Sequence, residues 1–195
     1  MIRTRIRTLL VATSAAALLA GCGTMHAGSA AVVGDRRISV EDLQSATKDA
    51  QAFVDAQAQA QNAQRQVVSQ SQVLYLLAAL PYIQELATKD GVGASESDAK
   101  AALAQWNVRN PSRAGILVVQ ANEGLSNIQQ LSDQKAAEAD ASITKSLLAD
   151  HVEISPRYGT FDPKVGRILQ ARPNWLPTPS PSAAAGSGAA ASPAP

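Results

Sequence analysis

The sequence is poor in the residues that build disulfides, metal sites and catalytic centres. It has one cysteine, Cys22, and two histidines, His26 and His151, which lie at opposite ends of the chain. A single cysteine excludes an intrachain disulfide, and a zinc site needs a spaced cluster of Cys or His side chains. Nucleophilic catalysis needs a nucleophile held against an oriented base. We therefore expect no metal, no cofactor and no enzymatic activity.

Aromatic residues are also scarce, at 4% of the chain, whereas alanine is abundant. A core that is poor in Phe and rich in Ala favours closely packed helices over a sandwich of sheets. The expected fold class is therefore mainly α. Because no disulfide is available, this fold must rest on packing alone.

The N-terminus has the three parts of an export leader: three arginines, an apolar stretch at 9–19, and the small residues Ala20 and Gly21. The apolar stretch is shorter than the roughly 20 residues that span a bilayer as a helix. Leu19-Ala20-Gly21-Cys22 resembles the lipobox of bacterial lipoproteins, which implies cleavage before Cys22 and acylation there by chains such as palmitate. Residues 1–21 are then a signal peptide. The alternative is an ordinary secretory signal beside an idle cysteine.

Cleavage of the leader changes the charge of the protein. It removes Arg3, Arg5 and Arg7 and leaves 14 basic residues against 16 acidic ones, a formal net charge of −2. A nucleic-acid partner is therefore not expected. Residues 22–29 are small and polar and are expected to be a lipidated tether, since two or more acyl chains anchor a protein stably. The expected location is the extracytoplasmic face of a cell membrane, on its periplasmic or wall side.

The mature chain begins with signals for a hairpin and a helix. Short strands are expected at 30–33 and around Ile38, joined by a two-residue turn at Gly34-Asp35. Ser39 is the expected N-cap of a helix whose apolar residues recur every three or four positions. The Ala/Gln run at 57–64 predicts a solvated helix end or a connection.

The densest apolar segment of the mature chain lies at 73–80 and predicts a helix, buried on most sides, that reaches Asp90. Pro81 falls inside this pattern, so either the helix kinks there, which we favour, or a new helix begins. Gly91 is the expected first residue after the helix. Gly91-Val92-Gly93 follows no strand, so we interpret it as a helix stop rather than a phosphate-binding loop.

Further helix signals follow. Ser95 to Asp98 resembles a capping box and predicts a helix that stops near Asn107. Asn110-Pro111 predicts the start of another helix, with Gly124 on its apolar stripe at a close approach to a neighbour. A last helix is expected at 133–150, a strand at 152–154, and a disordered tail, rich in Pro, Ala and Ser, at 176–195.

This order of elements resembles the N-terminal chaperone domain of the SurA and PrsA family of extracytoplasmic foldases. The resemblance rests on a strand at each end with the helices between them, and on Val152-Glu153-Ile154 followed by Pro156-Arg157-Tyr158-Gly159. It implies a multi-helix domain over 30–175 with a small β element in which 152–154 pairs with 31–33. Family members often carry a parvulin-type prolyl isomerase domain, for which 110–133 has no room.

Three functional hypotheses remain. The leading one is a membrane-anchored holdase that binds unfolded exported polypeptides, without catalysis, in an apolar groove between helices. The candidate client-binding residues are Phe53, Val54, Tyr75, Tyr82 and Trp106, although each could instead fill the core. The alternative is a structural or adaptor lipoprotein that docks on one fixed cell-envelope partner. The third, which we disfavour, is an isomerase with an unfamiliar site.

Overall fold

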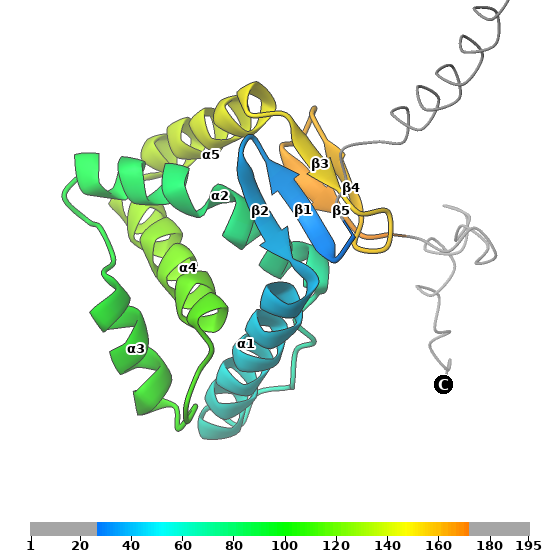
Figure 1. Cartoon of the computed structure of the whole chain (residues 1–195). Helices are drawn as coiled ribbons and strands as arrows, with labels where there is room; N and C mark the ends of the chain where they lie inside the picture. The colour runs from blue at the N-terminus through cyan, green and yellow to red at the C-terminus, as the bar shows by residue number, and fades with distance from the viewer. Residues whose placement is uncertain (1–26, 172–195) are drawn as a thin grey trace, which may run out of the picture.

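The structure is a computed structural model that describes residues 27–171. The predicted signal peptide, Cys22 and the tail at 176–195 lie outside the described residues. Helices dominate the described part, so the expected mainly α fold class is confirmed. In chain order (Figure 1), the elements are β1 (Ser29–Val33), β2 (Arg36–Ser39), α1 (Val40–Ala60), α2 (Gln70–Lys89), α3 (Glu96–Gln105), α4 (Arg113–Leu131), α5 (Asp133–Ala149), β3 (Val152–Ile154), β4 (Thr160–Asp162) and β5 (Arg167–Leu169).

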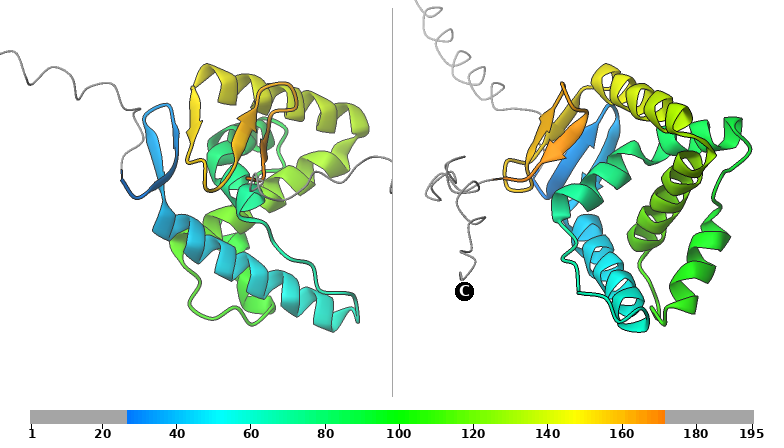
Figure 2. Two further views of the ribbon diagram at one scale, coloured as in Figure 1. Left: turned by 90° about the vertical axis from the view of Figure 1, so that its right-hand side faces the viewer. Right: turned by 180° about the vertical axis from the view of Figure 1, so that it is seen from behind.

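The centre of the domain is the pair α2 and α4, against which α1, α3 and α5 pack. Figure 2 shows the strands gathered at one end of the molecule, while α1 and α3 extend toward the other end. The core combines large side chains such as Leu43, Leu74 and Ile143 with many fully buried alanines. Small side chains allow the helices to approach closely, as the alanine content predicts.

A three-stranded sheet in the order β2-β1-β3 joins the two ends of the domain. In this sheet Ala31 pairs with Ile154 and Val33 with Val152, so the expected pairing of the terminal strands is confirmed. β1 and β2 form the expected hairpin, and the positive φ of its two-residue turn falls on Gly34. β1 begins at the buried Ser29, one residue before the expected start.

A second antiparallel hairpin, β4–β5, was not expected from the sequence. Its strands have three residues each, too few to show an alternating pattern. Ile168 of β5 is buried against the helical core, and Arg167 lies over the ring of Tyr75 on α2. The hairpin therefore belongs to the domain and covers one side of α2.

Most of the helix ends follow local sequence signals. Ser39 caps α1, and Ser95 and Asp98 form the expected capping box of α3. Gly91 ends α2 with a φ of +72°, and the N–H groups of Gly91 and Val92 donate to carbonyls of the last turn, as in a Schellman motif. The α1 helix ends at Ala60, inside the Ala/Gln run, and the rest of that run begins a linker to α2 that opens with a turn and has no regular secondary structure.

The expected start of α4 at Asn110-Pro111 is wrong. Asn110 has a φ of +51°, whereas an N-cap residue needs an extended backbone, and Ser112 caps the helix instead. The hydroxyl of Ser112 accepts from the N–H of Gly115 at 3.0 Å. Two strong capping signals lie within three residues, and the tertiary contacts of Ser112 described below select the second.

The central helices α2 and α4 pass each other without a break in α2. α2 runs without interruption through Pro81, so the alternative of a new helix starting there is wrong. Gly124 of α4 faces α2, as expected: a Cβ atom at this position would lie 3.1 Å from the Cγ2 of Ile83. Glycine at this position allows the two helices to pack closely.

Candidate functional site

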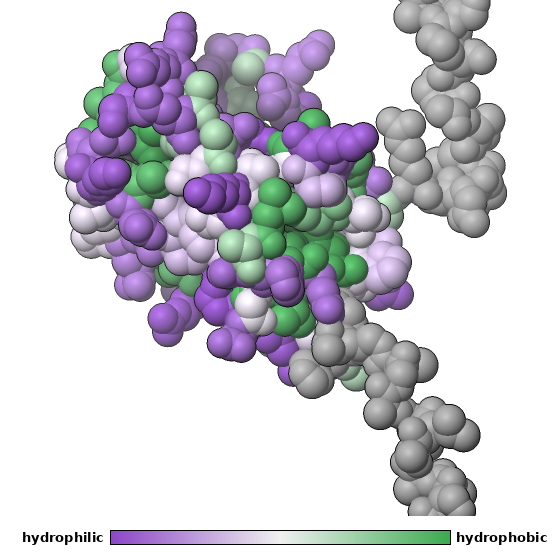
Figure 3. All heavy atoms as spheres, turned by 90° about the horizontal axis from the view of Figure 1, so that it is seen from above, coloured by the Kyte–Doolittle hydropathy of each residue, from purple (hydrophilic) through white to green (hydrophobic). Residues whose placement is uncertain are grey.

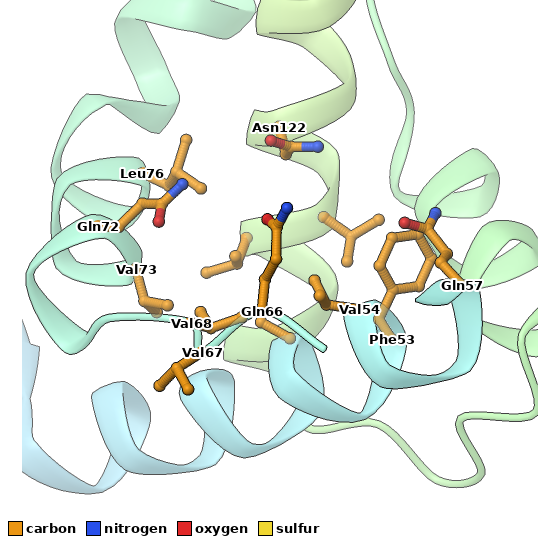
Figure 4. A pocket seen from close by; sticks show the side chains of 13 residues that line it. Phe53, Val54, Gln57, Gln66, Val67, Val68, Gln72, Val73, Leu76 and Asn122 are labelled. Atoms are coloured by element: carbon orange, nitrogen blue, oxygen red, sulfur yellow. The ribbon is translucent and has the colours of Figure 1, made fainter. Parts of the chain in front are cut away.

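The described domain has an apolar hollow of about 170 Å3 bounded by α1, α2, α4 and the linker between α1 and α2. Figure 4 shows this groove from close by. Its inner surface is made by Val73 and Leu76 of α2 and by Val118 and Val119 of α4, all of which are buried. The groove is lined by Ala50, Phe53, Val54, Gln57, Gln66, Val67, Val68, Gln72, Val73, Leu76, Val118, Val119 and Asn122.

The linker, residues 61–69, is held along the groove by one side chain of α1. The carboxamide of Gln51 donates from Nε2 to the carbonyl of Gln66 at 2.9 Å, and its Oε1 accepts from the N–H of Val68 at 2.8 Å. Between these two contacts, the side chain of Val67 is 90% exposed. Hydrogen bonds to Gln51 therefore hold the backbone of residues 66–68 against α1, and the side chain of Val67 is exposed to solvent at the edge of the groove.

Four further carboxamides surround the hollow: Gln57, Gln66, Gln72 and Asn122 (Figure 4). Among residues 27–171, the side chains of these four make no hydrogen bond. Each one offers a donor and an acceptor. The groove is thus apolar inside and polar at the rim, and none of its lining residues carries a charge.

A contact between α1 and the N-terminus of α4 helps to hold these two walls of the groove together. The half-buried carboxylate of Asp49 accepts from the N–H of Ser112 at 2.7 Å and from its hydroxyl at 2.6 Å. A negative charge at a helix N-terminus also interacts favourably with the helix dipole. Asp49 therefore fastens together two of the helices that form the groove.

The structure separates the five candidate client-binding residues into two groups. Phe53 and Val54 line the groove, and Trp106 of α3 meets Phe53 edge to face, with ring centroids 6.4 Å apart. Trp106 therefore supports the groove wall rather than lining it. Tyr75 and Tyr82 do not line this groove.

Tyr75 and Tyr82 instead have partners elsewhere on α2. Tyr75 is buried under Arg167, whose guanidinium lies 4.8 Å from the ring centroid, and burial raises the pKa of its phenol. The hydroxyl of Tyr82 donates to the carboxylate of Asp150, at the end of α5, and Arg36 lies over its ring. Burial raises the pKa of the Tyr82 phenol, and the hydrogen bond to Asp150 raises it further. Both rings connect α2 to neighbouring elements.

Sequence reasoning missed the valines of α4 and the four carboxamides. Val118 and Val119 have the spacing of core residues, and nothing local distinguishes a core residue at a groove from one in the middle of the domain. Of the four amides, only Gln57 lies in the run that predicts a solvated helix end, and no local pattern marks the other three as part of a site. One local signal could have indicated the groove. Val67 and Val68 are an apolar pair that follows Gln66 in the connection between two helices, where apolar side chains are not needed for a solvated loop.

A second apolar area lies over the strands. Half-buried Val152 and Ile154 of β3 and Phe161 of β4 line an open depression, together with Pro156 and Pro163. This surface is flatter than the groove between the helices and has no comparable rim of amides. Figure 3 shows that the face of the molecule seen from above also has hydrophobic residues gathered between hydrophilic ones.

No group of three or more His, Cys, Asp or Glu side chains within residues 27–171 is arranged to hold a metal ion. None of the helices in that range combines the length and hydropathy needed to cross a bilayer.

Comparisons with known proteins gave no relative. No protein-family model matches the chain, and neither a curated protein nor a solved structure matches it.

Proposed function

We propose that this protein is a lipoprotein, anchored through Cys22 on the extracytoplasmic side of a membrane, that holds unfolded exported polypeptides without acting on them chemically. The observation that carries this proposal is the groove between α1, α2 and α4, which is apolar inside, uncharged and open to solvent. Apolar surface of this kind is a binding site for exposed hydrophobic segments, since its burial is favourable and nondirectional.

The more specific fold that we propose is that of the chaperone domain of the SurA and PrsA family. The pairing of β1 with β3 around a set of helices supports it, because this pairing joins the two ends of the domain as the resemblance requires. The seven residues from Cys22 to Gly28 reach at most about 25 Å when extended. A lipid on Cys22 would therefore hold the start of β1, and with it the strand end of the domain, within about that distance of the membrane surface.

The holdase proposal is tested with the chain from Gly23 to Pro195, which contains the whole described domain. This protein is mixed at increasing ratio with a denatured client on dilution, and light scattering follows aggregation. We expect dose-dependent suppression, weakened when Val54→Thr and Val67→Thr place hydroxyls in the groove. The matched control is Val165→Thr, a change at a valine that is 50% exposed in the β4–β5 turn.

The alternative function is a structural or adaptor lipoprotein that docks on one fixed cell-envelope partner. The flatter apolar area over β3 and β4, with Phe161 as an aromatic anchor, supports it. The same assay separates the two functions. No suppression at several-fold excess of the protein would contradict the holdase and favour the adaptor.

Lipidation has a test of its own. Cys22→Ser in the full chain should yield a protein that lacks the acyl mass and leaves the membrane fraction. If the mass and the membrane fraction match those of the wild type, the anchor proposal is wrong.

A further inference from the structure

The lining of the groove restricts the charge of what can bind there. No lysine, arginine, aspartate or glutamate lines it. A charged group taken from water into such a surface loses hydration and gains no opposite charge, which is unfavourable. A nucleic acid or an anionic lipid headgroup would in addition need cations in the lining. The occupant that fits is uncharged and presents apolar side chains.

The size of the hollow restricts the occupant further. Pockets that enclose a drug-sized molecule measure roughly 300–1,000 Å3, whereas this hollow measures about 170 Å3. It has room for one or two apolar side chains of a longer molecule, the rest of which would lie along the rim. A segment of polypeptide meets this description better than a complete small ligand does.

The rim offers what a polypeptide backbone needs. Each carboxamide of Gln57, Gln66, Gln72 and Asn122 can donate to a carbonyl and accept from an N–H, and these groups have no partner among residues 27–171. Gln51 already makes such a pair of bonds beside the groove: its amide donates to the carbonyl of Gln66 and accepts from the N–H of Val68. In an extended chain, the carbonyl of one residue and the N–H two residues later point the same way.

We propose that the groove binds a short, extended, uncharged polypeptide segment, with one or two apolar side chains in the hollow and its backbone paired with these carboxamides. This inference rests on the proposed function and names the class of ligand that the same site takes. Most backbone groups of a folded protein are already paired, and its apolar side chains are largely buried, so an unfolded segment makes both kinds of contact more readily. The recognition is independent of side-chain sequence apart from the need for apolar, uncharged residues.

The test uses the chain from Gly23 to Pro195 and a fluorescein-labelled peptide of alternating leucine and threonine, capped at both ends, with binding followed by anisotropy. The variants are Gln72→Leu and Asn122→Leu, which keep the approximate shape of the side chain at two exposed positions. Each should raise Kd about 3- to 10-fold, the effect of losing a typical hydrogen bond. The matched control is Gln129→Leu, at an exposed position of α4 outside the groove, which should leave Kd unchanged.

The sign of the effect distinguishes this proposal from binding by apolar contact alone. Leucine adds apolar surface to the rim, so a purely hydrophobic groove would bind the peptide more tightly in both variants. A second peptide, of the same sequence but with alternate backbone nitrogens methylated, keeps the side chains and loses the N–H donors. It should bind at least about 10-fold more weakly because it loses more than one hydrogen bond, and a peptide with lysine in place of leucine should not bind measurably.

Several results would overturn the proposal. Unchanged or tighter binding by Gln72→Leu and Asn122→Leu, or equal binding of the methylated peptide, would show that the amides do not hold a backbone. If suppression of aggregation persists in that case, the holdase function stands and only this inference fails. If the protein neither binds the peptides nor suppresses aggregation, the proposed function fails with it.

Other occupants would also be detected. A dimer in sedimentation equilibrium that Gln72→Leu dissociates would assign the groove to a second copy of the chain. Tighter peptide binding after deletion of 172–195 would assign it to the protein's own tail. Either result would overturn the proposal.

Discussion

Replacement of Asp49 by alanine should destabilise the domain, because its carboxylate joins α1 to the N-terminus of α4. The carboxylate of Asp49 accepts two hydrogen bonds from Ser112, which caps α4. It also lies against the first turn of that helix, since a Cβ atom on Gly115 would be 2.4 Å from its Oδ2. The Asp49→Ala variant leaves the Ser112 N–H without this acceptor and frees the capping hydroxyl to rotate away.

The expected loss follows from these contacts. A hydrogen bond to a charged group contributes about 1.5–3 kcal/mol, and Asp49 makes two, but it is only half-buried, so water replaces part of what is lost. We expect a decrease of about 2–4 kcal/mol in the free energy of unfolding. For a domain of this size, 1 kcal/mol corresponds to roughly 3 °C in Tm, so Tm should fall by about 6–12 °C.

Thermal unfolding followed by far-ultraviolet circular dichroism measures this shift. The matched control is Asp55→Ala on the same helix, because Asp55 accepts one bond, from Gln51 of α1 at 3.0 Å, and makes no hydrogen bond to α4 among residues 27–171. Asp49→Asn keeps an acceptor oxygen without the charge and should give an intermediate Tm. If Asp49→Ala unfolds within about 1 °C of the wild type, the carboxylate does not hold α1 to α4 and the reasoning is refuted.

Three further predictions concern the strands and the tyrosines. Gly159→Ala should open the β4–β5 hairpin and lower the free energy of unfolding by at least about 2 kcal/mol. The reason is that φ is +141° at this position and a Cβ atom would lie 2.1 Å from the carbonyl oxygen of Leu169. Backbone hydrogen exchange at 160–169 that is as slow as in the wild type would contradict this prediction. Tyr75→Phe should leave Tm unchanged or raise it. The buried hydroxyl of Tyr75 has no partner among the described residues, and phenylalanine keeps the ring under Arg167. A clear decrease in Tm would refute this prediction. Burial raises the pKa of Tyr75 and Tyr82 in the folded state, so ionisation of these phenols should destabilise the domain. Stability should be complete below about pH 10 and fall as pH rises through the folded pKa values. Urea unfolding between neutral and strongly alkaline pH measures this loss, which should be smaller in the Tyr75→Phe, Tyr82→Phe double variant; an equal loss would contradict the assignment.

Local signals in the sequence were enough to place most helix ends. The serine caps at 39 and 95 and the glycine at 91 act through the nearest few residues, so their effect does not depend on distant parts of the chain. The start of α4 was mispredicted because Asn110-Pro111 and Ser112 are both good local starts. The carboxylate of Asp49, 63 residues earlier in the chain, decides between them.

The candidate site was predicted less well than the fold. Phe53 and Val54 line the groove, whereas Tyr75 and Tyr82 lie in contacts between α2 and its neighbours. All four are large, apolar or amphipathic residues on helices, and their local patterns are alike. Whether such a residue faces a groove depends on how far apart the neighbouring helices lie, which no local pattern contains.

The sequence by itself determined the elements that depend on short-range chemistry: the helical class from alanine and the 3.6-residue period, the helix caps, the β1–β2 turn, and the lipobox that predicts the anchor. The pairing of β1 with β3 needed the resemblance of the whole order of elements. Only the tertiary structure decided that α1, α2 and α4 leave a hollow between them, that Gln51 holds the linker beside it, and that four amides surround it. These features arise from contacts between residues far apart in the chain, whose positions are set by the packing of the complete domain.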